Sequence, residues 1–223
     1  MNNKELEIFK GEVKEVHAKI LKECQKNEEL NSLYKGCQIF YTPYRNTPDV
    51  LFIGLNPGGG YAKANSGRIV ESFEPLEAVD PNDLMYEARN CFRDVGIENI
   101  LNNAVVTNGR FFATNGMEEL LSFFTKLSEN LRNEVKIMSA KWIQTLIKII
   151  SPKMIMCLGN TSFDYLHEVY NQEIVIIENK NSPLEAKIGN IPVIGCQRNG
   201  STIIKREALV ERLREYVKEI AIL

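Results

Sequence analysis

The sequence predicts an α/β fold, a three-layer α/β/α sandwich with a mainly parallel central sheet. Short apolar runs that end in turn residues alternate along the chain with segments whose apolar residues recur every three or four positions. A short continuous apolar run is typical of a strand buried on both faces of a parallel sheet, and strand–helix alternation is the pattern of α/β proteins. We expect residues 1–223 to form a single domain, with residues 1–36 as an N-terminal helical appendage packed on it.

The expected elements follow from these two periodicities and from the turn residues between them. Helices are expected over residues 6–24, 80–96, 118–124, 131–150, 160–170 and from about 205 onward. Strands are expected over residues 38–44, 49–56, 103–108, 153–159, 173–177 and 191–196. Asp80 and Pro81 suit the first positions of their helix, and Gly96 ends it. Residues 61–81 have no clear period, and an irregular segment of this length beside a strand end is often functional.

Composition and charge restrict the classes of partner. A net charge of -2 and a pI near 5.9 give no overall basic field, so binding to nucleic acid requires a local basic patch. The 5 cysteines are odd in number and none form a Cys-x-x-Cys pair, so no metal or other cofactor is expected. Widely spread cysteines suit a reducing compartment, and we expect a cytoplasmic protein. No signal peptide is expected, and no apolar run is long enough to span a bilayer.

The chain is organised around a predicted strand that ends in Asn56, Pro57 and Gly58. Pro57 cannot donate a hydrogen bond to a neighbouring strand, so the strand must end by Asn56. The glycines that follow carry no Cβ, so their backbone N–H groups can face whatever lies beyond the strand. Because ligands of open α/β sheets bind at the carboxyl ends of the strands, Asn56 is expected at the mouth of a site. The same three residue types also form ordinary strand-exit turns.

A second predicted strand ends in an asparagine, Asn108, followed by Gly109. If this strand neighbours the first, two side-chain amides face each other across one pocket. An amide offers a donor and an acceptor on one planar group, which suits pairing with the edge of a pyrimidine. Asn103 is an alternative candidate for this role, and Asn108 is preferred because it terminates its strand.

These residues resemble the uracil-DNA glycosylase superfamily. The run Gly-Leu-Asn-Pro-Gly at residues 54–58 is similar to the family's first motif, in the form shared by the mismatch-specific and single-strand-selective glycosylases. The strand that ends at Asn108 resembles the one that presents a base-reading asparagine in several branches. Residues 157–159 and the helix after them resemble the next strand–helix step. The resemblance covers residues 49–223, and the first motif is its specific part.

The resemblance implies a monofunctional DNA glycosylase, which hydrolyses the N-glycosidic bond of uracil or a related damaged base in DNA repair, without a metal ion. Asn56 would orient the attacking water, and Asn108 would read the flipped base. Base contacts are implied for residues near these two: Leu55, Pro57, Gly58, Tyr61, Phe73 and Phe111. The aromatic members of that set either stack on the base or pack their loops onto the body. Contacts with DNA are implied for the loop residues Arg198, Asn199, Gly200 and Ser201, although Arg198 can equally lie in solvent.

The chain departs from the family at the second catalytic motif. Most branches have His-Pro-Ser there, whereas residues 197–201 read Gln-Arg-Asn-Gly-Ser. The missing histidine, and an amide where the faster branches have Asp, imply slow or selective catalysis. The expected partner is DNA, single- or double-stranded, with a damaged or mismatched base, bound by a monomer.

Two alternatives to an active glycosylase remain open. The first is a catalytically weak or inactive protein that binds nucleic acid or a nucleobase on the same fold. The second is an unrelated doubly wound protein whose glycines bind a nucleotide phosphate. The sequence has neither a lysine-bearing phosphate loop nor a Gly-x-Gly-x-x-Gly fingerprint to support the second.

Overall fold

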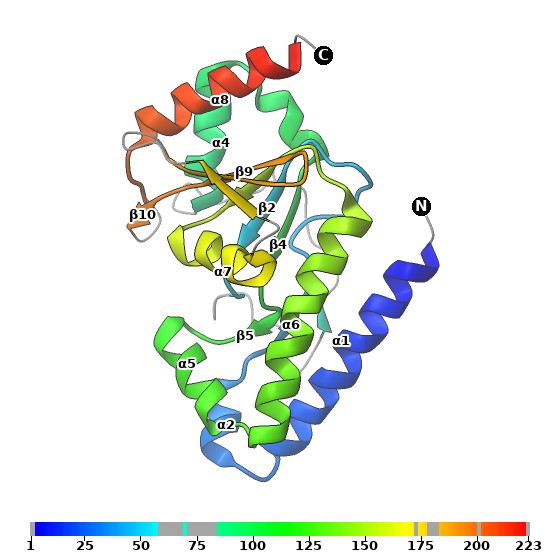
Figure 1. Cartoon of the computed structure of the whole chain (residues 1–223). Helices are drawn as coiled ribbons and strands as arrows, with labels where there is room; N and C mark the ends of the chain where they lie inside the picture. Colours follow the sequence, from blue (N-terminus) through cyan, green and yellow to red (C-terminus); the bar gives the residue numbers. More distant parts are fainter. Residues whose placement is uncertain are drawn as a thin grey trace.

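The computed structural model describes residues 3–57, 69–70, 84–171, 174–177, 183–199 and 202–221, and it is built on a six-stranded sheet (Figure 1). The strand order is β4 (Val105–Asn108), β2 (Leu51–Gly54), β6 (Ile155–Cys157), β9 (Ile191–Gly195), β8 (Leu184–Ile188) and β7 (Ile174–Ile177). The first four strands pair in parallel, and β8 and β7 extend the sheet in antiparallel fashion. The prediction of a mainly parallel central sheet is confirmed.

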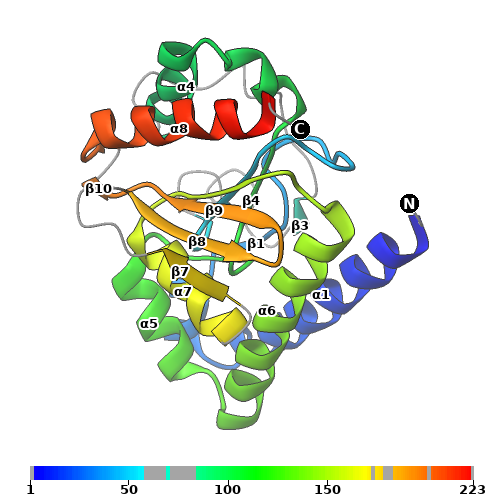
Figure 2. The same ribbon diagram turned by 45° about the horizontal axis from the view of Figure 1, so that its top comes forward.

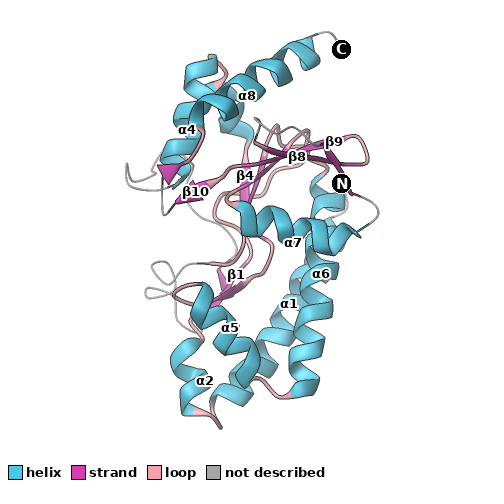
Figure 3. Ribbon diagram, turned by 60° about the vertical axis from the view of Figure 1, so that its left-hand side comes forward, coloured by secondary structure: helices cyan, strands magenta, loops and turns pink. Residues whose placement is uncertain are grey.

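Helices lie on both faces of this sheet (Figure 2). One hydrophobic core cluster joins one face to α1 (Asn3–Cys24), α2 (Glu28–Leu33), α5 (Met117–Lys126), α6 (Glu129–Ile150) and α7 (Asn160–Tyr170). A second cluster joins the other face to α4 (Leu84–Val95) and α8 (Arg206–Ala221), which lie together on that side of the sheet (Figure 3). Successive residues of a strand point to opposite faces, so Leu51 and Ile53 belong to the first cluster and Val50 and Phe52 to the second.

Shorter elements complete the fold. A small sheet has the order β3 (Ile69–Val70), β1 (Gly36–Gln38) and β5 (Phe112–Ala113), and β10 (Arg198–Asn199) pairs with β11 (Thr202–Ile203). A 3₁₀ helix, η2 (Glu98–Asn103), precedes β4. The strand predicted over residues 38–44 is therefore misplaced: β1 ends at Gln38, and beyond it Phe40 forms an isolated bridge with Thr107. The Thr42 hydroxyl accepts a hydrogen bond from the Val106 N–H of β4. This side-chain contact takes the place of a backbone hydrogen bond between strands, so the strand does not continue to Tyr44.

Two helices end where the sequence predicts. α4 ends before Gly96, whose φ is +78°, and α6 ends before Ser151, which takes the left-handed conformation ahead of Pro152. The predicted start of α4 at Asp80 and Pro81 lies outside the described residues. β8 was not predicted; it forms because Gly189, with φ of +58°, turns the chain into a hairpin with β9.

The N-terminal helix is part of the first core cluster. Its apolar stripe packs against α6, where Trp142 is fully buried and donates its indole N–H to Glu12 at 3.2 Å. His17 is buried and lies 2.5 Å from the Tyr34 hydroxyl. This hydrogen bond satisfies both polar groups within the core.

Candidate functional site

The structure brings the carboxyl ends of β2 and β4 together, as the sequence predicts. The two strands are parallel neighbours, and Gly54 lies opposite Asn108. From β2 the chain passes first to β4 on one side and later to β6 on the other. This reversal of direction makes the end of β2 a topological switch point, the place where open α/β sheets bind ligands. Asn56 follows β2 directly, so the candidate site includes it.

Asn108 is held firmly at this edge. Its side chain is 5% exposed, and its amide N–H donates to the Tyr41 hydroxyl at 3.0 Å. The amide oxygen lies across Gly54: a Cβ added to that glycine would stand 2.3 Å from Asn108 Oδ1. Glycine at position 54 is therefore required by the asparagine on the neighbouring strand.

The amide of Asn56 has one defined orientation. Its Nδ2 donates to the Pro57 carbonyl and to Thr114 Oγ1, both at 3.2 Å. The carbonyl can only accept, which fixes the nitrogen on that side. Thr114 is fully buried, and its hydroxyl donates to the Gly116 carbonyl at 3.0 Å, so its oxygen is left to accept from Asn56. The Asn56 amide oxygen is therefore directed away from these partners.

The remaining candidates for base contact differ in burial and in whether the structure describes them. Leu55 is partly buried against the first core cluster, and Pro57 is buried. Gly58, Tyr61 and Phe73 lie outside the described residues.

Phe111 does not line the candidate site. It is fully buried, with its ring stacked on Trp142 at 6.0 Å between centroids and meeting Phe9 edge-on at 5.8 Å. Because both neighbours are core residues, its ring has no face free for a base, and we assign it to the core.

The alternative base-reading residue, Asn103, lies at the other end of β4. Its amide contacts Asp49 Oδ2 at 3.3 Å and the Thr47 carbonyl at 3.4 Å, in the segment that enters β2. Asn103 therefore sits at the amino edge of the sheet, whereas Asn108 sits at the carboxyl edge.

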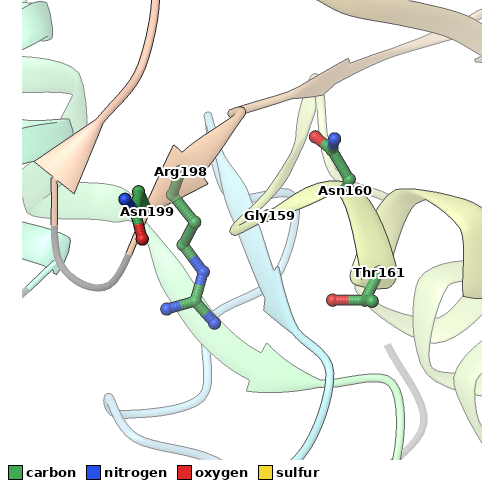
Figure 4. Close-up of a pocket in the computed structure, with 5 residues that line it drawn as sticks. All are labelled: Gly159, Asn160, Thr161, Arg198 and Asn199. Atoms are coloured by element: carbon green, nitrogen blue, oxygen red, sulfur yellow. The ribbon is translucent and has the colours of Figure 1, made fainter.

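A pocket of about 390 Å³ opens at the carboxyl ends of β6 and β9. Figure 4 shows Arg198 and Asn199, from β10, on one side of it, and Asn160 and Thr161, from the start of α7, on the other. Arg198 passes over Gly159, whose φ is +117°; a Cβ there would stand 2.9 Å from Arg198 Nε. Gly200 and Ser201 lie outside the described residues.

The start of α7 gives this pocket donors. Gly159 is the N-cap residue, and its carbonyl accepts from the Phe163 N–H and from the Ser162 hydroxyl. The first N–H groups of a helix have no acceptor within the helix, so they favour negative charge at this end. Together with the Arg198 guanidinium they make the pocket suitable for a phosphate oxygen.

Several residues at this edge were missed by sequence reasoning. Tyr41 and Thr114 reach the site only through the packing of distant segments, and nothing in their local sequence marks them. Asn160 and Thr161 had a signal, since they open a helix that directly follows a strand.

No protein-family model matches the chain, and no curated protein matches its sequence. Within the described ranges, no group of three or more His, Cys, Asp or Glu side chains is placed to hold a metal ion. In the same part of the chain, no helix combines the length and apolar character needed to cross a membrane. The 5 cysteines are free and buried, and burial raises the pKa of the Cys24 and Cys91 thiols to about 11.

Proposed function

We propose that the protein is a DNA glycosylase-like hydrolase on a uracil-DNA glycosylase-like fold, which cleaves the N-glycosidic bond of uracil or a related damaged base. The observation that carries this proposal is the fixed amide of Asn56. Thr114 and the Pro57 carbonyl hold its nitrogen at the switch point of the sheet, on the same edge as a second rigid amide, that of Asn108.

The proposed reaction depends mainly on how the protein positions the attacking water. As the glycosidic bond breaks, positive charge develops on the sugar and negative charge on the departing base, and a water must attack the sugar carbon. The Asn56 amide oxygen accepts a hydrogen bond from that water and so directs a lone pair at the sugar. An amide does not remove the proton, so the rate enhancement rests on orientation and on stabilisation of charge.

Base recognition falls to Asn108 in this proposal. Its Nδ2 already donates one N–H to Tyr41, which fixes the plane of the amide. The amide oxygen and the second N–H then offer one acceptor and one donor to a pyrimidine edge, the pattern that uracil complements.

The pocket between α7 and β10 supplies the contact with the DNA backbone. Arg198 and Asn199 are exposed there, and the N-terminus of α7 faces the same opening (Figure 4). Contacts of this kind position a strand without reading its sequence. They also give the local positive site that a chain with a net charge of -2 needs for binding DNA.

The test is release of free base from oligonucleotides that carry uracil, a mismatch or another common lesion, in single- and double-stranded form. We expect release by the natural protein and a loss of at least roughly 100-fold in Asn56→Ala, because the water loses the acceptor that positions it. Asn103→Ala is the matched control, since it removes the same amide from the opposite edge of the sheet. Absence of release across the panel, or equal activity of both variants, would refute the proposal.

A second candidate function is binding of nucleic acid or a nucleobase without cleavage. It is favoured by the positions of the chain's 2 histidines. His17 is buried beside Tyr34, and His167 is exposed within α7, so neither lies at the end of a central strand to stabilise a base anion. Salt-dependent DNA binding by a protein that releases no base would select this function.

A further inference from the structure

Arg110 is attached to the candidate site by its backbone. It follows Asn108 and Gly109 directly, and its N–H donates to the Leu55 carbonyl at 2.8 Å, one residue before Asn56. The Gly109 N–H donates in the same way to the Gly54 carbonyl at 2.8 Å. These two hydrogen bonds continue the β2–β4 pairing beyond the strands, so the backbone of Arg110 is as fixed as the sheet edge.

The side chain of Arg110 lies between two aromatic rings from different helices. Its guanidinium carbon is 5.0 Å from the ring centroid of Phe124, on α5, and 4.8 Å from that of Tyr165, on α7. Both rings are buried, at 6% and 7% exposure. Tyr165 is itself held against Gly109, where an added Cβ would stand 2.5 Å from the ring. The guanidinium thus has little freedom to move.

Within the described residues, no carboxylate forms an ion pair with Arg110. Its side chain contacts the Phe124 ring and Tyr165, whose hydroxyl its charge also reaches. The side chain is partly buried, so the missing counter-ion is costly, and the rings compensate for only part of that cost. An aromatic ring attracts the guanidinium charge without offering an oxygen acceptor to its N–H groups. Those donors match the oxygens of an oxyanion.

We propose that Arg110 binds a phosphate of the DNA strand, next to the nucleotide whose base enters the site between Asn56 and Asn108. The inference rests on the proposed function only in that DNA supplies the phosphate. Arg198, in the pocket on the far side of β6, would hold a second phosphate of the same backbone. The simpler explanation is that Arg110 is a cation–π link that joins α5 to α7 and binds nothing.

Salt dependence separates these explanations. Each phosphate contact contributes about 0.7 to the slope of log K against log salt for single strands, whereas a purely structural link contributes nothing. The probe is a fluorescein-labelled single-stranded oligonucleotide without a lesion, and the measurement is anisotropy over a series of salt concentrations. The variants are Arg110→Gln and Arg110→Lys, with Arg45→Gln as the matched control. Arg45 is exposed in the segment that enters β2, away from the carboxyl edge.

We expect Arg110→Gln to bind the oligonucleotide roughly 10-fold more weakly and to lose about 0.7 of the slope. Arg110→Lys is expected to keep the slope and to lose part of the affinity, because an ammonium lacks the planar fork. Arg45→Gln should match the natural protein. A natural affinity and slope in Arg110→Gln would overturn the inference, and if that variant does not fold, a natural affinity in Arg110→Lys would overturn it.

The proposed function is tested separately, by the release of free base. Binding that depends on Arg110 without any release of base would support this inference and refute the glycosylase. Release of base with no effect of Arg110 on binding would do the reverse. A natural protein that does not bind the oligonucleotide at all would refute this inference, whatever the base-release assay shows.

Discussion

Gly54→Ala tests whether the contact between β2 and the Asn108 amide organises the site. The added Cβ would stand 2.3 Å from Asn108 Oδ1, where ordinary contact begins at 3.4 Å, so the amide must move by about 1 Å. That movement breaks the 3.0 Å hydrogen bond to Tyr41. Overpacking costs about 1–3 kcal/mol and the lost hydrogen bond about 1, while the stiffer unfolded chain returns about 0.4–1.

The net expectation for Gly54→Ala is a destabilisation of about 2 kcal/mol, or a fall in Tm of about 4–8 °C for a chain of this size. Thermal unfolding followed by circular dichroism measures it. Gly11→Ala is the control: Gly11 is exposed in α1 with nothing within 4 Å of the added Cβ, so the same change should stabilise by about 0.5–1 kcal/mol. In an Asn108→Ala background the cost of Gly54→Ala should largely disappear. Equal costs in both backgrounds, or a gain like that of Gly11→Ala, would refute the reasoning.

Three further predictions concern the site and the framework. Thr114→Val should lower kcat for base release about 10-fold with little change in KM, because Asn56 loses one of its two acceptors, and Thr114→Ser should restore it. Glu185→Ala should cost about 3 kcal/mol in urea unfolding, since it removes the buried 2.8 Å partner of Arg212 while the contact with the exposed Glu215 is 3.6 Å, and Glu185→Leu with Arg212→Met should recover most of that. Two arginines lower the pKa of Glu98 to about 2 from 4.5, so its stabilisation is present above pH 4.5 and is lost as the pH falls towards 2; the difference in urea midpoint between the natural protein and Glu98→Gln should shrink over that range.

The strand ends were predictable because each rests on a local rule. A continuous apolar run predicted β2, Pro57 limited where it could end, and the parallel arrangement placed Asn56 and Asn108 at one edge. Their surroundings were not predictable in the same way. Asn56 bonds to Thr114, 58 residues away, and Asn108 to Tyr41, 67 residues away. Such partners depend on how whole segments pack, and no local periodicity encodes that.

Phe111 was expected to contact a base because of its place in the sequence, but it packs in the core. Its position just after Asn108 suggested a ring at the site. The segment instead forms β5 and directs its aromatic side chains at Trp142, where burial of a whole ring is worth about 1.5–3 kcal/mol. Nothing in the local sequence marks Arg110, its neighbour, because an arginine in a loop is ordinarily solvated. Only the two rings from α5 and α7 make it unusual.

In the proposed glycosylase, the orientation of Asn56 limits the chemistry that the site can perform. With its nitrogen held by Thr114 and the Pro57 carbonyl, the amide presents oxygen, and an oxygen can align a water without taking its proton. Bond cleavage must then be driven by the departure of the base, which is easiest for bases that leave as stable anions. A site of this design discriminates through the leaving group as much as through base contacts. Substrates whose damaged base is a better leaving group than uracil should therefore react faster, and the rate of base release should rise with the acidity of the base. A rate that does not change with this acidity would mean that departure of the base does not limit the reaction.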